Sequence, residues 1–131
     1  MGFTFDTNEK GIEIVMKDYQ AILMDYIWET GEEGSNTKFA WIHVNKVLME
    51  KGRSISRASI IFFMNDMVDE GIFKFRETTG KGGYHRIYSP VYYEEDFKKY
   101  LVKQIMNKLL EEFPKETKEV LSKGLSGPLL T

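Results

Sequence analysis

A chain of 131 residues with 42% hydrophobic and 14% aromatic residues is large and apolar enough to bury a core, which excludes a wholly disordered protein. The absence of cysteine excludes disulfides, cysteine-based zinc sites and thiol catalysis, and is compatible with an intracellular address. No apolar run approaches the roughly 20 residues that span a bilayer, and the first residues lack the basic and apolar regions of a signal peptide. We therefore expect neither a membrane span nor a signal peptide.

The net charge of −2 is unevenly distributed along the chain. Residues 1–50 hold 4 basic and 9 acidic side chains, whereas residues 51–90 hold 7 basic and 4 acidic ones, and residues 91–131 hold 7 of each sign. Positive charge therefore concentrates in the middle segment, where a phosphate backbone could be bound. An excess of this size in a segment of this length is also common by chance.

Apolar residues recur at helical spacing in two segments of the first half of the chain. The first predicted helix covers about residues 18–29, with Asp18 as its N-cap. The second covers about residues 38–50, and either Asn36 or Thr37 is placed to cap it. Glycines follow both segments and are expected to end both helices.

A third predicted helix covers about residues 57–70 and shows the clearest apolar periodicity of the three. Ser56 is its expected N-cap, and Gly71 is expected just beyond its end. Only five residues, 51–55, separate it from the second helix. That length suits the turn of a helix-turn-helix.

The run at residues 72–76 alternates aromatic and basic side chains, which predicts a half-buried β-strand. Residues 78–83 are rich in glycine and are expected to form a turn, residues 84–88 the returning strand, and Pro90 its end. The glycine-rich run does not have the spacing of a P-loop and lies between strands, so nucleotide binding is not expected.

Helical periodicity returns after the hairpin, over about residues 94–113, and Pro114 is expected either to break this helix or to start another short one through Leu121. The apolar stripe is wider than a small domain can cover, so the helix either folds back on its own domain or pairs with a second copy. We favour the dimer, because two copies supply two DNA-binding helices. The expected interface residues are Phe97, Tyr100, Leu101, Ile105, Leu109 and Phe113.

This order of elements predicts an α+β, mostly helical fold: a winged helix-turn-helix, with a three-helix core and a β-hairpin wing, followed by a C-terminal dimerisation helix. The winged domain is expected at residues 14–90 and the helical dimerisation segment at residues 91–123. Residues 1–13 and 124–131 are expected to be tails.

The third helix buries one face and leaves the other available to the major groove of duplex DNA. Arg57, on its first turn, can reach guanine or phosphate, whereas Phe62 either contacts thymine methyl groups or widens the core. Asp66 and Asp69 would repel phosphate and are expected to point away from DNA. Basic wing residues are candidates for phosphate contacts, or belong to an ordinary solvated hairpin. The expected DNA-binding residues are Arg53, Ser56, Arg57, Ser59, Phe62, Lys74, Arg76, Lys81, His85 and Arg86.

Catalytic and metal sites find little support in the residue pattern. His43 and His85 lie on different predicted elements and have no partners at metal-ligand spacing. No nucleophile and base are arranged for covalent catalysis. We therefore expect no metal, no cofactor and no enzymatic activity.

The run SRASIIFFMNDMVDEGIF, from Ser56 to Phe73, resembles the recognition helix and first wing strand of winged-helix repressors. Together with residues 18–28 and 80–90 it is similar to the penicillinase-repressor family, over about residues 18–113. The resemblance implies a cytoplasmic homodimeric repressor that binds palindromic operators. It does not imply copper sensing, because the copper-responsive branch uses C-terminal cysteines, nor does any feature indicate the membrane partner of the proteolytically relieved branch.

Two functions of different class remain open: a sequence-specific DNA-binding transcriptional regulator, and a winged helix that binds protein within a larger assembly. A DNA-binding domain should gather its basic residues on one face, whereas a protein-binding domain should expose an apolar patch around Ile61 and Phe62. The basic residues concerned are Arg53, Arg57, Lys81 and Arg86.

Overall fold

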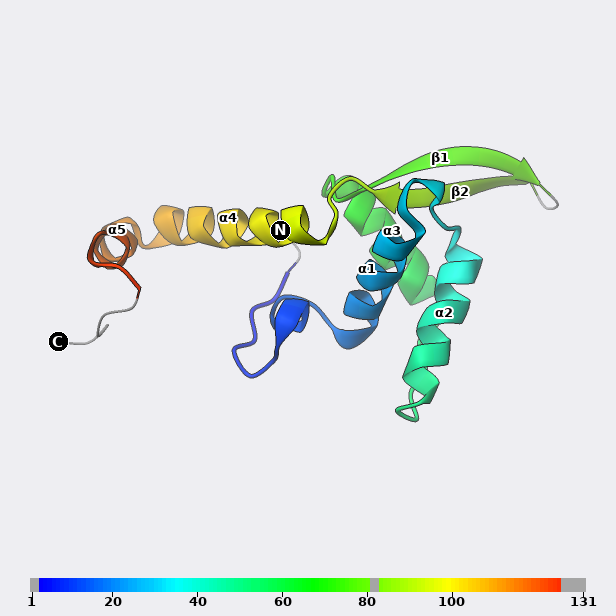
Figure 1. The fold of residues 1–131 in the computed structure, drawn as a ribbon, viewed down its shortest axis with the longest axis horizontal. Coiled ribbons are helices and arrows are strands. Elements are labelled where there is room, and N and C mark those ends of the chain that lie inside the picture. Colours follow the sequence, from blue (N-terminus) through cyan, green and yellow to red (C-terminus); the bar gives the residue numbers. More distant parts are fainter. Residues whose placement is uncertain (1–2, 81–82, 126–131) are drawn as a thin grey trace. The chain divides into compact units, whose positions relative to one another are not determined.

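The computed structural model describes residues 3–80 and 83–125 and divides into two compact units, Met1–Glu94 and Glu95–Thr131. In the described part of the chain, five α-helices and one antiparallel β-hairpin follow the predicted order, which confirms the α+β winged-helix layout (Figure 1). The elements are η1 (Gly11–Ile14), α1 (Asp18–Thr30), η2 (Gly31–Glu33), α2 (Thr37–Met49), α3 (Arg57–Asp69), β1 (Phe73–Gly80), β2 (Gly83–Pro90), α4 (Glu94–Glu112) and α5 (Pro114–Lys123).

Side-chain caps mark the beginnings of α2 and α3. Asn36 Oδ1 accepts a hydrogen bond from the backbone N–H of Phe39 at 2.8 Å, and Ser56 Oγ accepts one from Ser59 N–H at 3.1 Å. Both bonds satisfy amides that the first helical turn leaves unpaired. Gly71, with φ at +77°, follows α3 as predicted.

The beginning of α1 differs from the prediction. Its N-cap is Lys17, whose backbone N–H donates to Gln20 Oε1 at 2.9 Å. Asp18 is the first helical residue, and its carboxylate accepts from the N–H of Tyr19 at 2.7 Å. The expected Asp18 cap is therefore wrong, because the glutamine three residues into the helix folds back and holds the preceding residue.

The core of the first unit lies where the apolar faces of α1, α2 and α3 meet, and the base of the hairpin contributes to it. Burying a Val, Leu, Ile, Phe or Met side chain stabilises a fold by about 1.5–3 kcal/mol. The packing of these apolar faces is therefore the main stabilising feature of the unit. The buried side chains are Leu23, Met24, Ile27, Ala40, Val44, Leu48, Ile60, Phe63, Met64, Met67, Ile72, Phe73 and Tyr88.

The hairpin strands are longer than the sequence suggested. Thr78 pairs with His85 and Gly80 pairs with Gly83, so the ladder continues through most of the glycine-rich run. The expected turn at residues 78–83 is too long, because the β-branched threonines fit an extended, paired backbone.

A short segment before α2 attaches to the outer edge of the hairpin. Ser35 N–H donates to the carbonyl of Tyr88 at 2.9 Å, and Tyr88 N–H donates back to the carbonyl of Ser35 at 2.8 Å. Gly34 has φ at +72°, and a Cβ atom built there would lie 2.3 Å from the Tyr88 carbonyl oxygen. Only glycine allows this approach, which ties the wing to the start of α2.

The segment expected to be an N-terminal tail contains ordered structure. Thr4 N–H donates to the carbonyl of Val15 at 3.2 Å, and Asp6 N–H donates to that of Ile14 at 2.7 Å. Val15 and the following Met16 are buried. Residues 3–16 therefore form part of the first unit.

The second unit consists of α4 and α5. Pro114 is the first residue of α5, and Thr117 Oγ1 donates to the carbonyl of Leu109 at 3.1 Å, which fixes the corner between the two helices. Phe97 and Leu101 are buried. Large apolar side chains are exposed farther along, at Val102, Leu109, Phe113, Val120, Leu121 and Leu125. Within residues 3–80 and 83–125, no helix is both long enough and apolar enough to cross a bilayer.

Candidate nucleic-acid interface

The link between α2 and α3 is held by side chains of α2. Trp41 Nε1 and Asn45 Nδ2 both donate to the backbone carbonyl of Ile55, at 2.9 and 3.1 Å. Asn45 Oδ1 in turn accepts from the Ile55 N–H at 2.9 Å. Side chains of α2 thus bind both the N–H and the carbonyl of Ile55, which holds the turn of the helix-turn-helix against α2. This sets the position of Arg57 at the start of α3.

A concave surface of about 400 Å³, which we name the α3–wing groove, lies between α3, the start of α2 and β2. None of the described residues that line it is acidic, whereas several are basic or aromatic. A surface with basic side chains and no carboxylate attracts the negatively charged phosphate backbone of a nucleic acid. The lining residues are Asn36, Thr37, Lys38, Arg57, Ile61, Asn65, Tyr84, His85, Arg86 and Tyr88.

The contribution of α3 to the groove follows from helical spacing. Arg57, Ile61 and Asn65 are four residues apart and therefore lie along one side of the helix. Arg57 is exposed, and no described residue forms an ion pair with its guanidinium. Phe62 is 70% exposed, so it faces solvent and does not widen the core, which excludes that interpretation of this residue.

The carboxylates of α3 lie elsewhere. Asp66 and Asp69 line a different cavity, which they share with Phe3 and Gln20. The expectation that these acids point away from the basic surface agrees with this placement. Neither carboxylate lines the groove.

The wing side chains of the groove are fixed by a network centred on Asn65. Tyr88 Oη donates to Asn65 Oδ1 at 2.6 Å, and Arg86 Nη1 donates to the same oxygen at 3.2 Å. The Arg86 guanidinium also lies over the ring of Phe75, 4.0 Å from its centroid. Burial raises the pKa of the Tyr88 hydroxyl, an effect that Arg86 partly opposes, so the hydroxyl keeps its proton at neutral pH.

Two predicted wing contacts lie outside the groove. Lys74 Nζ donates to Glu32 Oε2 at 3.0 Å, and Arg76 Nη2 donates to the backbone carbonyl of Glu33 at 2.9 Å. Both residues therefore contact η2. Alternation along β1 places them on the face opposite Phe75, which is the ring that Arg86 covers. The structure thus gives these two cations a role in attaching the wing to the loop before α2.

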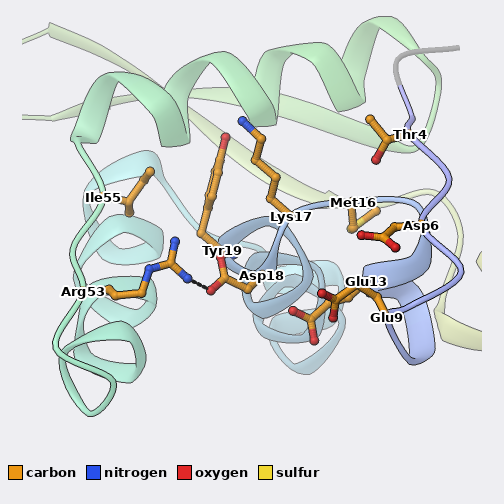
Figure 2. A pocket seen from close by; sticks show the side chains of 10 residues that line it. All are labelled: Thr4, Asp6, Glu9, Glu13, Met16, Lys17, Asp18, Tyr19, Arg53 and Ile55. Atoms are coloured by element: carbon orange, nitrogen blue, oxygen red, sulfur yellow. Dashed lines mark hydrogen bonds and ion pairs between the residues drawn. The ribbon is translucent and has the colours of Figure 1, made fainter.

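Arg53 also lies apart from the groove. Its guanidinium pairs with the carboxylate of Asp18, beside another pocket, of about 490 Å³, formed with the N-terminal segment (Figure 2). Figure 2 places the carboxylates of Asp6, Glu9 and Glu13 across this pocket from Arg53, whose carboxylate partner is Asp18. This contact joins the helix-turn-helix link to the start of α1.

The two predicted serines lie at the start of α3 but do not line the groove. The Oγ atoms of Ser56 and Ser59 are 2.9 Å apart and hydrogen-bonded, and the Ser56 hydroxyl also caps the helix by accepting from the Ser59 N–H. Of the predicted wing residues, His85 and Arg86 line the groove. Lys81 lies outside the described residues.

The predicted DNA-binding residues do not include seven of the residues that line the groove, among them Lys38, Asn65 and Tyr84. Lys38 is the second residue of α2, two residues after the N-cap Asn36, and side chains in the first turn of a helix point back toward its N-terminus. Asn65 lies on the free side of α3, eight residues after Arg57, and Tyr84 is 78% exposed on β2. The helical spacing from Arg57 was a sufficient signal for Asn65, whereas Lys38 and Tyr84 join the groove only through tertiary packing.

The described residues contain no cluster of three or more His, Asp or Glu side chains that could hold a metal ion. The model of the penicillinase repressor family matches residues 17–125, which include the winged unit together with α4 and α5. No curated protein and no solved structure shows significant similarity to the chain. Because the family match covers most of its length, the chain belongs to the penicillinase repressor family, whose members are transcriptional regulators and not enzymes.

Proposed function

We propose that this protein binds duplex DNA sequence-specifically as a homodimer and represses transcription from a palindromic operator in the cytoplasm. The observation on which this depends is the α3–wing groove: Lys38, Arg57 and Arg86 meet there beside the free face of a capped helix, with no lining carboxylate among the described residues. Basic side chains along a helix and hairpin of this arrangement suit a DNA duplex.

In the proposed complex, α3 lies in the major groove. Arg57, which is exposed and has no ion-pair partner among the described residues, would contact guanine or phosphate. Phe62, with 70% of its surface exposed, would contact thymine methyl groups. Arg86 would contact the backbone from the wing, and Lys81 is proposed to do the same from the hairpin tip.

Dimerisation is proposed to occur through the second unit. Leu109 and Phe113 are predicted interface residues whose side chains are exposed, and Tyr100 and Ile105 are half-buried. Phe97 and Leu101 are buried within the single chain, so they would contribute less to contact with a partner than expected. A two-fold dimer would present two copies of α3 to half-sites about one helical turn, roughly 34 Å, apart.

The second candidate function is a protein-binding winged helix. The exposed Phe62 favours it, because a large apolar side chain on a free helix face also suits a protein partner. Association with protein would lack the steep salt dependence that phosphate contacts produce.

Selection of bound duplexes from a random pool tests the proposal. We expect enrichment of a two-fold symmetric site, with a slope of log affinity against log salt of about −5 to −7 if three or four phosphates are contacted per protomer. In a control selection from the same pool with Arg57→Ala protein, this site should be enriched more weakly than with the unaltered protein. If the unaltered protein enriches no sequence, the proposed function is wrong and the protein-binding alternative gains support.

A further inference from the structure

Asn65 lies at the junction between α3 and the wing. Its Oδ1 atom is 2.6 Å from the hydroxyl of Tyr88 and 3.2 Å from Nη1 of Arg86. Both partners come from β2, more than 20 residues later in the chain. A single side-chain oxygen therefore connects the helix to the hairpin.

The chemistry of the partners determines which way the Asn65 amide faces. A guanidinium has only donors, so the atom that faces Arg86 must be the acceptor, Oδ1. Since Tyr88 shares this oxygen, its hydroxyl must donate as well. The opposite amide orientation would place Nδ2 against the guanidinium, where two donors would meet.

The remaining half of the amide is available to a ligand. With both lone pairs of Oδ1 occupied, Asn65 can offer only the two N–H groups of Nδ2. No described residue accepts from Nδ2, and no described side chain that is buried has a nitrogen or oxygen without a partner. The amide nitrogen is therefore accessible to solvent, and Asn65 lines the groove together with Arg57 and Ile61.

We propose that Asn65 contacts a base edge as a donor only and thereby selects guanine at one position of each half-site. This inference rests on the proposed binding of duplex DNA. The usual contact of asparagine with adenine needs Oδ1 to accept from N6 while Nδ2 donates to N7. Here Oδ1 is already occupied, whereas guanine presents two adjacent acceptors, O6 and N7, to an amide that can only donate.

The decisive variant is Asn65→Asp. The aspartate has nearly the same shape and still accepts from Tyr88 and Arg86, so the junction is retained, but an acceptor replaces the donor that faces the groove. We expect selection from a random duplex pool to replace guanine by cytosine at one position per half-site, because the cytosine N4 amine donates. Affinity for the site selected by the unaltered protein should fall roughly 10- to 100-fold.

The matched control is Asp66→Asn, the reverse exchange at the next residue of α3. Asp66 lines another cavity, so the selected site should be unchanged. Thermal unfolding followed by circular dichroism establishes that both variants fold. An unchanged selected site with folded Asn65→Asp protein would overturn the inference and leave the proposed function intact. Failure of the unaltered protein to enrich any site would overturn both.

A second variant decides the question if Asn65→Asp does not fold. Tyr88→Phe keeps the buried ring but removes one of the two donors to Oδ1. One lone pair of Asn65 then becomes free to accept from adenine N6, and we expect adenine to join guanine at the same position. Continued exclusion of adenine would contradict donor-only recognition.

Discussion

The guanidinium of Arg86 lies over the ring of Phe75, 4.0 Å from its centroid, while Nη1 of the same group donates to Asn65. The ring lies on β1 and the arginine on β2, where Phe75 pairs with Tyr88, two residues along from Arg86. The wing therefore orients its own cation before any ligand is present. Such preorganisation reduces the loss of side-chain conformational entropy that would otherwise oppose a phosphate contact.

Phe75→Leu tests this orienting effect. Leucine keeps an apolar side chain but removes the aromatic face, so the cation–π contribution of about 0.5–1 kcal/mol is lost. We expect DNA affinity to fall two- to fivefold in fluorescence anisotropy, with nearly unchanged unfolding. The control Phe5→Leu alters another exposed phenylalanine outside the groove and should leave affinity unchanged. Equal affinities for both variants would contradict the orienting role.

Comparison of Arg57→Ala with Arg53→Ala tests whether DNA binding depends on the groove or on basic residues outside it. Arg57 lines the groove, whereas Arg53 pairs with Asp18 outside it. We expect Arg57→Ala to weaken specific DNA binding by about 1–3 kcal/mol with little change in stability. Arg53→Ala should weaken DNA binding less and reduce stability by no more than about 1 kcal/mol, because the pair is partly exposed. Titration of labelled duplex and thermal unfolding measure the two effects. The assignment of the recognition helix fails if Arg57→Ala binds like the unaltered protein.

Lys81→Ala concerns the tip of the wing. A lysine that contacts only phosphate contributes equally on every sequence. We expect the variant to weaken specific and random duplexes alike, and to reduce the magnitude of the salt slope by about 1 for each lost contact. Affinities measured between about 50 and 200 mM salt give this slope. An unchanged slope would remove Lys81 from the interface.

Local chemistry made much of the fold predictable. The hydroxyl of Ser56 and the glycine at position 71 act within one helical turn, so the bounds of α3 follow from neighbouring residues alone. The start of α1 was less predictable, because Asp18 competed with the side chain of Gln20, which holds Lys17 as the cap instead.

The candidate site was less predictable because it depends on contacts between distant segments. Alternation showed that Lys74 and Arg76 share a face of β1, but not which face. That choice is made by the pairing with β2 and by the loop at Glu32 and Glu33, which receives both cations. Arg53 was likewise placed by a partner 35 residues earlier in the chain.

Gly34→Ala tests the attachment between the wing and the start of α2. The new Cβ would lie 2.3 Å from the Tyr88 carbonyl oxygen at a φ of +72°, so backbone must shift. Gly52→Ala is the matched control, because Gly52 has φ at +70° but nothing within 4 Å of its Cβ position. We expect about 1 kcal/mol of destabilisation for Gly52→Ala from backbone strain, and clearly more for Gly34→Ala. Denaturant unfolding can be followed by Trp28 and Trp41, and equal losses would contradict the steric argument.

Phe113→Ser tests self-association through the second unit. Phe113 is the N-cap of α5, is 57% exposed and makes no side-chain capping bond, so serine at this position favours the helix while removing apolar surface. If Phe113 contacts a partner copy, the dimer dissociation constant in analytical ultracentrifugation should rise at least about tenfold. The effect is large because a two-fold interface loses the phenylalanine of both protomers. Helix content should be unchanged. Phe5→Ser, which alters an equally exposed phenylalanine of the first unit, should leave the dissociation constant as it was. Loss of self-association in both variants, or in neither, would place the dimer interface elsewhere.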